Sequence, residues 1–149
     1  MSNRMDLLKA GASQLNVSLS EHQLDQFETY FQELCDWNRR ANLTAIVEYD
    51  AVQIKHFLDS LTICLTARDI LARSKTMPTR VLDIGTGAGR PGLALKIAFP
   101  EIELTLIDSV SKKTSFVTHM LEELELTGVS VRTGRSEACL LYTSDAADE

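Results

Sequence analysis

The first half of the chain places its hydrophobic residues at helical spacing. The clearest series, at three- and four-residue steps, is Leu24, Phe27, Tyr30, Phe31, Leu34 and Trp37. It predicts an amphipathic helix of about five turns. Ser20 followed by Gln23 is a capping-box pattern, so we expect the helix to begin at Ser20. Leu7 and Leu8 predict a shorter helix before it.

A second helical series follows the polar segment 38–44. Asp50 is placed to cap this helix, and Ile54, Phe57, Leu61 and Leu65 form its expected buried face. Residues 72–79 form a polar connector that contains a proline and ends the helical region.

After Thr79 short hydrophobic runs alternate with helical patterns. We predict strands at 80–84, 102–108 and 129–132, with helices at 91–99 and 111–126 between them and Gly128 ending the second helix. This βαβαβ order predicts a parallel sheet with right-handed crossovers. The fold class is therefore α/β, with a helical extension at 1–79 and an α/β region at 80–138.

Composition and charge narrow the functional classes. The chain is 44% hydrophobic and carries 15 Lys and Arg against 21 Asp and Glu, a net charge of −6. This balance argues against a protein that coats nucleic acid non-specifically. No apolar run reaches the roughly 18 residues of a membrane span, and no secretory signal pattern opens the chain. The three scattered cysteines fit neither a zinc site nor a disulfide framework.

The strongest chemical signal is the glycine-rich segment 83–92, between the first predicted strand and the following helix. Gly87, Gly89 and Gly92 match the dinucleotide-binding pattern, which is weak evidence alone. Asp83 would repel a diphosphate and attract a cation, and Pro91 removes a phosphate-binding N–H. These features favour S-adenosylmethionine, which carries sulfonium and ammonium groups. A structural turn without a ligand is the alternative.

Asp108 ends the second predicted strand, 19 residues after Gly89. A carboxylate at this spacing is placed to accept hydrogen bonds from ribose hydroxyls. The alternative is a helix-capping role or an ion pair with Lys112 or Lys113.

Several motifs occur together and in a fixed order. They are Asn42-Leu43-Thr44, His56-x-x-Asp59-Ser60-Leu61, the segment 83–92, Leu106-Ile107-Asp108-Ser109 with Lys112-Lys113, and Gly134-Arg135-Ser136-Glu137. This combination resembles the RsmG family, also called GidB, from about Leu7 to Glu137. The resemblance implies a class I S-adenosylmethionine-dependent (Rossmann-like) methyltransferase that modifies N7 of a guanine in 16S ribosomal RNA. It also implies a cytoplasmic enzyme, a monomer when complete, that acts on the small ribosomal subunit.

The same resemblance assigns cofactor-binding residues. Gly85 and the position of Arg90 match cofactor contacts in the first loop. Asp83, Gly87 and Gly89 of the same segment are further predicted cofactor-binding residues. Asp108 matches the acid beside the ribose, and Ser136 and Glu137 match the pair beside the adenine. Arg90 departs from the family pattern, which more often has Phe or Leu there, so only its backbone contact carries over.

Candidate substrate contacts are weaker. His56 could line the cleft above the cofactor, although a histidine at the edge of a helix more often serves packing. Arg39, Arg40, Lys112 and Lys113 are candidate phosphate contacts, although such pairs are usually solvated surface. We assign no acid–base pair and no metal ligand, because guanine N7 carries no proton to remove.

The predicted sheet is incomplete. The resemblance implies seven strands, and three are predicted here, so we expect an apolar open edge on the first strand, poor stability and an inactive or weakly active chain. Residues 139–149 do not resemble the family, and we interpret them as a foreign, adapter-like tail. Two other functions stay open: a nicotinamide-dependent oxidoreductase unit, which Asp83 and Pro91 disfavour, and a non-catalytic RNA- or protein-binding module.

Overall fold

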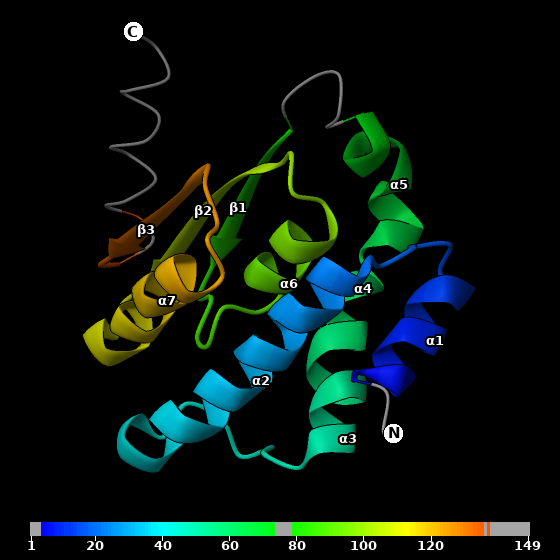
Figure 1. Ribbon diagram of the computed structural model, residues 1–149. Coiled ribbons are helices and arrows are strands. Elements are labelled where there is room, and N and C mark those ends of the chain that lie inside the picture. Colours follow the sequence, from blue (N-terminus) through cyan, green and yellow to red (C-terminus); the bar gives the residue numbers. More distant parts are fainter. Residues whose placement is uncertain (1–3, 74–78, 136, 138–149) are drawn as a thin grey trace, which may run out of the picture.

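The computed structural model describes residues 4–73, 79–135 and 137. The N-terminal half is helical and consists of α1 (Asp6–Gln14), α2 (Glu21–Ala41), α3 (Tyr49–Val52), the π-helix η1 (Gln53–Leu58), α4 (Asp59–Leu61) and α5 (Cys64–Arg73). The rest comprises β1 (Arg80–Ile84), α6 (Gly92–Ala98), β2 (Glu103–Asp108), α7 (Ser111–Glu123) and β3 (Val129–Thr133) (Figure 1). The predicted α/β class and helical extension are therefore confirmed. Most of the predicted connector 72–79 and all of 139–149 lie outside the described residues.

Helix α2 begins as the sequence predicts. The Ser20 hydroxyl accepts a hydrogen bond from the Gln23 N–H, and the Gln23 side chain accepts one from the Ser20 N–H. These reciprocal bonds satisfy amide groups that a helix start otherwise leaves free. The predicted hydrophobic face is buried at Leu24, Phe27 and Tyr30.

The segment after α2 departs from the prediction. Glu48, not Asp50, is the residue that precedes α3. The following turn is a π-helix, whose wider turn shifts the buried face, so that Gln53 and His56 are buried. Ile54, predicted to be buried, is 42% exposed. Leu65 is 63% exposed, because a break at residues 62–63 separates α5 from the preceding helix.

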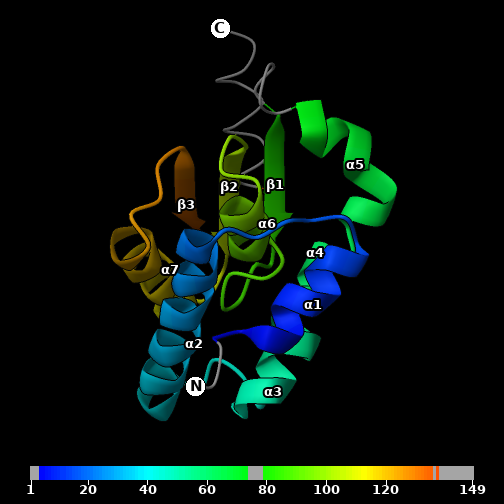
Figure 2. The ribbon, with the colours of Figure 1, turned by 45° about the vertical axis from the view of Figure 1, so that its right-hand side comes forward.

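The three strands form one parallel sheet in the order β1-β2-β3. Helices α6 and α7 pack against one face, and α2 packs against both helices on the side away from the sheet (Figure 2). The carboxyl ends of the strands therefore meet at one edge, where Ile84 and Asp83 of β1 lie beside Ile107 and Leu106 of β2. Every strand boundary falls within one residue of the prediction.

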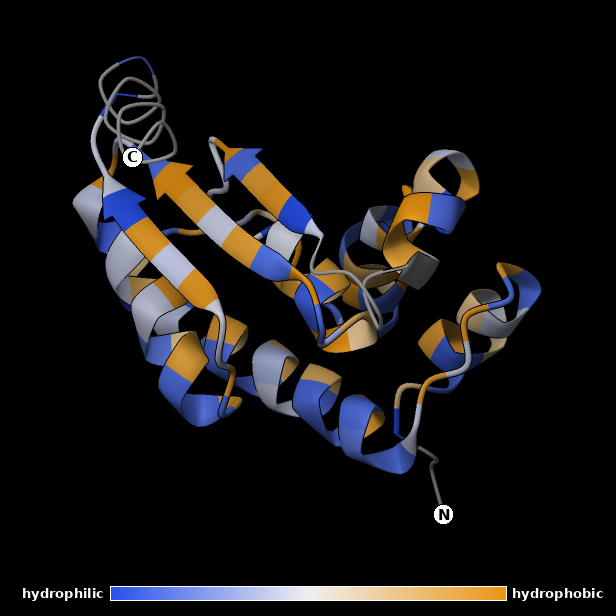
Figure 3. Ribbon diagram, turned by 90° about the horizontal axis from the view of Figure 1, so that it is seen from above, coloured by the Kyte–Doolittle hydropathy of each residue, from blue (hydrophilic) through white to orange (hydrophobic). Residues whose placement is uncertain are grey.

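Strand β1 forms one edge of the sheet. Among the described strands it pairs only with β2, and its Leu82 and Ile84 side chains are 40% and 49% exposed. Hydrophobic positions continue along the neighbouring strand β2 (Figure 3). This is the open, apolar edge that the sequence predicts.

The helical extension and the sheet share one hydrophobic core. The Phe57 ring on η1 lies 4.9 Å from the Tyr30 ring on α2, and the Tyr30 ring lies 6.4 Å from Phe116 on α7. At the surface, His119 Nε2 lies 2.7 Å from Glu33 Oε2 and joins α7 to α2. Packing is therefore continuous across the predicted boundary at residue 79, and the division into domains stays a prediction.

Helix α5 presents the hydrophobic side chains of Leu65 and Ile70 to solvent, and Ile63, just before the helix, is also exposed. It is interrupted by a non-helical residue, Ala67. None of the helices in the described part of the chain has both the length and the hydrophobicity needed to cross a membrane.

Helix α7 ends earlier than predicted. The Leu126 N–H donates to the Leu121 carbonyl at 3.0 Å, and the Glu125 N–H donates to the Glu122 carbonyl at 3.2 Å. This is a Schellman ending, with Glu125 in the left-handed position at a φ of 53°. The predicted stop at Gly128 is therefore wrong, because Gly128 follows the helix and belongs to the turn before β3.

We expect the substitution Glu125→Gly to raise the free energy of unfolding by about 0.5–1 kcal/mol, because glycine adopts the left-handed conformation without a Cβ clash. Glu122→Gly, inside the same helix, is the matched control and should lower it by about 1 kcal/mol. Urea unfolding at neutral pH measures both. Equal destabilisation by the two substitutions would contradict this account of the helix end.

Candidate functional site

The glycine-rich turn between β1 and α6 is anchored on the neighbouring strand. The Gly85 and Thr86 N–H groups both donate to the Ile107 carbonyl, at 2.8 and 3.1 Å. Gly85 has a φ of 72°, in the left-handed region that favours glycine. A Cβ at this position would meet no atom within 4 Å, so backbone conformation rather than crowding accounts for the glycine.

Asp83 holds the turn from inside. Its Oδ2 accepts hydrogen bonds from the Thr86 hydroxyl at 2.7 Å and from the Gly92 N–H at 3.0 Å. Burial raises the pKa of the Asp83 carboxyl, and the two hydrogen bonds oppose that rise. The carboxylate that the sequence assigns to cofactor binding is therefore also a structural acceptor within the turn.

Gly92 permits a close approach between α6 and the sheet. A Cβ at this position would lie 2.4 Å from Leu106 Cδ2 and 2.9 Å from Asp83 Oδ2. The first amides of α6 are also occupied, since Gly92 donates to Asp83 and Leu93 donates to the Gly89 carbonyl at 2.7 Å. A diphosphate would need such amides free, so this helix start is unsuited to a dinucleotide.

Asp108 shapes the turn from the end of β2. Its Oδ2 accepts from the Gly87 N–H and its Oδ1 from the Val110 N–H, both at 2.9 Å. The predicted capping alternative is wrong, because Val110 is the residue that precedes α7 and no side chain caps that helix. In the described chain Asp108 also forms no ion pair with Lys112 or Lys113. A carboxylate oxygen has a second lone pair, which leaves capacity for a ligand hydroxyl.

A cavity of about 400 Å³ opens at the carboxyl ends of the strands. Its walls are formed by Ile84, Gly85, Ile107, Asp108, Ser109, Gly134, Arg135 and Glu137. Three residues predicted to bind cofactor, Gly85, Asp108 and Glu137, therefore meet around one space. Asp83, Gly87 and Gly89 lie in the turn without lining the cavity, and Ser136 lies outside the described residues.

Arg90 turns away from this cavity toward the helical extension. Its Nη1 donates to the carbonyl of Lys55, at 3.2 Å, on the π-helix. The side chain that departs from the family pattern thus ties the turn to η1.

His56 is in the interior of the extension, not on the cavity. It is 2% exposed, and its Nε2 lies 2.9 Å from the Thr44 hydroxyl, which also accepts from the Ile46 N–H at 3.1 Å. Burial lowers the His56 pKa to about 4, with Arg90 adding to the effect. This neutral, buried histidine matches the packing alternative, and its assignment as a substrate contact stays a prediction.

The four predicted phosphate contacts come from two neighbouring helix ends. Arg39 and Arg40 lie at the end of α2, and Lys112 and Lys113 lie at the start of α7, directly after the carboxyl end of β2. Trp37 of α2 lies 5.6 Å from Phe116 of α7, which holds the two ends together. The Arg40 guanidinium lies 5.2 Å from the centre of the Trp37 ring and 3.6 Å from the Asp36 carboxylate, so part of its charge is balanced.

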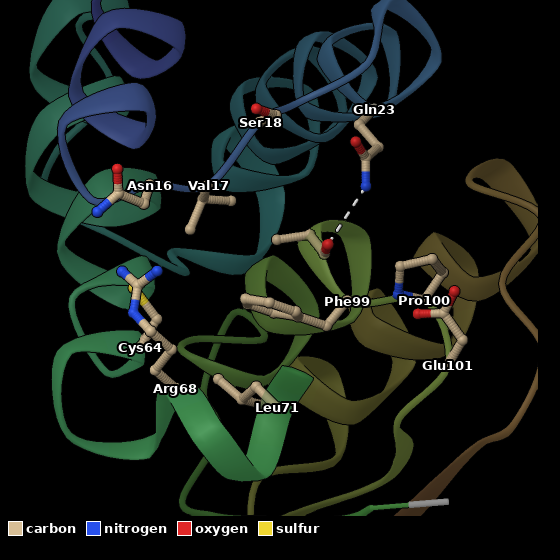
Figure 4. Close-up of a pocket in the computed structure, with 11 residues that line it drawn as sticks. Asn16, Val17, Ser18, Gln23, Cys64, Arg68, Leu71, Phe99, Pro100 and Glu101 are labelled. Atoms are coloured by element: carbon tan, nitrogen blue, oxygen red, sulfur yellow. Dashed lines mark hydrogen bonds between the residues drawn. The ribbon is translucent and has the colours of Figure 1, made fainter. Parts of the chain in front are cut away.

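A larger hollow of about 490 Å³ lies at the opposite end of the sheet, before β2 (Figure 4). It is bordered by the α1–α2 connection, α5 and residues 98–101, and Gln23 donates across it to the Ala98 carbonyl at 3.3 Å. The Arg68 guanidinium there donates to the Leu15 carbonyl. None of the predicted site residues lines this hollow.

Sequence reasoning missed the contribution of Tyr30, which it placed simply in the core. The Tyr30 hydroxyl donates to the carbonyl of Ala88 in the glycine-rich turn. The sequence offered one signal: Tyr30 carries a hydroxyl on a helix face that otherwise consists of Phe, Leu and Trp. It did not identify a partner 58 residues away.

The fold and the turn define the class of protein. A parallel βαβαβ sheet with a glycine-rich turn after the first strand and an acid at the end of the second is the first part of a class I methyltransferase fold. A family model described as rRNA small subunit methyltransferase G (GidB) matches residues 23–147. The chain belongs to this GidB family of methyltransferases, as the sequence resemblance predicts.

Curated relatives carry the name ribosomal RNA small subunit methyltransferase G. One from Dehalococcoides mccartyi is 49% identical over 133 residues, covering 89% of this chain and 54% of the relative. Relatives from Lachnoclostridium phytofermentans and Lactococcus lactis are 45% and 42% identical, covering 85% and 89% of this chain and 50% and 53% of their own lengths. The chain spans about half the length of the curated relatives it matches.

Because His56 is buried and its pKa is lowered, we expect the free energy of unfolding to fall as the pH becomes acidic. The His56 pKa is lowered from 6.5 to about 4 on folding, so its contribution is complete above pH 6.5 and is lost as the pH falls toward 4. Between about pH 7.5 and about pH 5 this amounts to a loss on the order of 2 kcal/mol.

Urea unfolding across this pH range measures the effect. His56→Gln should remove that part of the pH dependence, whereas His22→Gln, at an exposed position of α2, should retain it. An unchanged pH profile in His56→Gln would refute the assignment.

Proposed function

We propose that this chain provides the cofactor-binding part of an enzyme that methylates N7 of a guanine in 16S ribosomal RNA, with S-adenosylmethionine as methyl donor. The observation that carries the cofactor choice is the occupied start of α6. Asp83 takes the Gly92 N–H that a diphosphate would use, and the Asp108 and Glu137 carboxylates of the cavity wall suit a cationic ligand. The choice of rRNA rests on the family to which the chain belongs.

The residues around the 400 Å³ cavity fit such a ligand. The free lone pairs of Asp108 are placed to accept from ribose hydroxyls, and Glu137 and the neighbouring Ser136 are assigned to the adenine side. Gly85 leaves the backbone accessible, because no side chain covers it.

Methyl transfer to guanine N7 needs no general acid or base. S-adenosylmethionine supplies a methyl group to the N7 lone pair, the methyl–sulfur bond breaks, and S-adenosylhomocysteine leaves. Since guanine N7 carries no proton, the chain needs to align the two partners and to suit the movement of positive charge from the sulfur to the guanine ring, rather than to provide a base.

The basic ends of α2 and α7 are the proposed contact with rRNA. Lys112 and Lys113 follow the same strand end that carries Asp108, so RNA phosphates bound there would lie beside the cavity. With a net charge of −6, binding would depend on this local surface and on RNA shape. We further propose that the complete protein acts as a monomer in the cytoplasm.

Two alternatives remain as outcomes of experiment. A nicotinamide-dependent oxidoreductase would require diphosphate binding at α6, against the occupied amides described above. A non-catalytic RNA-binding module would keep the basic surface and the fold but show no methyl transfer.

Calorimetry tests the cofactor. We expect the chain to bind S-adenosylmethionine or S-adenosylhomocysteine but not NAD. Glu137→Gln should weaken binding about five- to tenfold, because it removes a charged hydrogen-bond acceptor from the cavity wall. Glu122→Gln, exposed on α7, is the matched control and should leave affinity unchanged. Preference for NAD would exclude the proposed function.

Transfer of radiolabelled methyl groups into small ribosomal subunits tests the substrate. The chain and a chimera that continues after Glu137 with the second half of a curated relative are compared. Replacing Lys112 and Lys113 with Ala should raise the KM for subunits and reduce its salt dependence. Arg80→Ala, which removes a charge at the amino end of β1, should change neither. RNA binding without methyl transfer by the chimera would favour the non-catalytic module.

A further inference from the structure

Tyr30 connects the helical extension to the glycine-rich turn. It is fully enclosed in the core, with its ring packed between Phe57 of η1 and Phe116 of α7. These aromatic neighbours fix the direction of the side chain, and its hydroxyl reaches the Ala88 carbonyl. The Ala88 carbonyl is partly buried, so losing this partner would incur a desolvation cost.

The absence of a side chain at Gly89 leaves space in the turn for this hydroxyl. A Cβ at Gly89 would lie 2.9 Å from the Tyr30 Oη, so a larger residue at position 89 would crowd the hydroxyl. Burial raises the pKa of Tyr30 above its usual range, so the phenol stays protonated and donates at neutral pH.

Apart from the bond of Arg90 to Lys55 on η1, the other attachments of the turn come from the sheet and from Asp83. Ile107 and Asp108 hold residues 85–87, and Asp83 holds Thr86 and Gly92. Tyr30 holds the intervening peptide from the opposite side, through α2. The turn is therefore fixed between two structural layers rather than by the sheet alone.

We propose that Tyr30 is a positioning residue for the cofactor site: its hydroxyl fixes the Ala88 peptide and thereby sets the conformation of the glycine-rich turn beside the cavity. The consequence for S-adenosylmethionine affinity rests on the proposed function. The conformational role does not, because it concerns only groups of this chain.

Amide hydrogen exchange and calorimetry on the whole chain test the proposal. In Tyr30→Phe, exchange at the Gly89 and Arg90 amides should accelerate about fivefold, the effect of losing one neutral hydrogen bond, while exchange at Leu106 in β2 stays unchanged. The Kd for S-adenosylmethionine should rise about three- to fivefold. A merely structural contribution of the ring would not produce this local effect, because Phe retains the ring.

Tyr49→Phe is the matched control. The Tyr49 hydroxyl donates to Glu28 at 2.6 Å and accepts from the Met5 N–H at 3.0 Å, within the same extension and away from the turn. This substitution should lower stability without accelerating exchange in the turn. The proposal is overturned if Tyr30→Phe leaves exchange at Gly89 and Arg90 unchanged, or if Tyr49→Phe accelerates it equally.

Hydrogen exchange and calorimetry together distinguish failure of the proposed cofactor from failure of the positioning role of Tyr30. If the wild-type chain does not bind S-adenosylmethionine but Tyr30→Phe still accelerates exchange in the turn, the cofactor assignment fails and the positioning role stands. If Tyr30→Phe accelerates exchange and leaves a measurable Kd unchanged, the hydroxyl does not position the cofactor site.

Discussion

The candidate site depends on one constraint: α6 begins in close contact with the sheet, and the Asp83 carboxylate lies in that contact. Position 92 has no room for a Cβ between Leu106 and Asp83, and the space beside it is occupied by a carboxylate that accepts two hydrogen bonds. Because the group is buried, its acceptor capacity must be satisfied by nearby donors. Thr86 and Gly92 are those donors, and together they determine the path of the glycine-rich turn.

The path of the glycine-rich turn affects which ligand can bind beside it. A helix start whose first amides already have protein partners offers little to a phosphate, although the glycine spacing alone matches a dinucleotide pattern. The groups that we propose to face the ligand lie instead around the cavity at the strand ends, where Asp108 and Glu137 contribute two carboxylates. The same residues thus explain both the shape of the turn and the kind of ligand that it favours.

The helical extension is part of the site's support. It contacts the turn through Tyr30 on α2 and through Lys55 on η1, which accepts a hydrogen bond from Arg90. The π-helix turns His56 inward, where its hydrogen bond with Thr44 holds the preceding loop. A methyltransferase sheet and its N-terminal helices are therefore held together by polar contacts as well as by the shared core, and the basic ends of α2 and α7 come to lie side by side.

The sequence by itself determined the strand and helix order, because periodicity, a capping box and a glycine-rich turn are local signals that need no partner. It also determined the family, through motifs in a fixed order. Only the tertiary structure decided the π-helix, the end of α7 at Glu123 and the partners of Asp83, Arg90 and Tyr30. Arg90 and Tyr30 form hydrogen bonds to residues 35 and 58 positions away, and Asp83 meets Gly92 only because α6 packs against the sheet. No local spacing pattern encodes which of these contacts will be made.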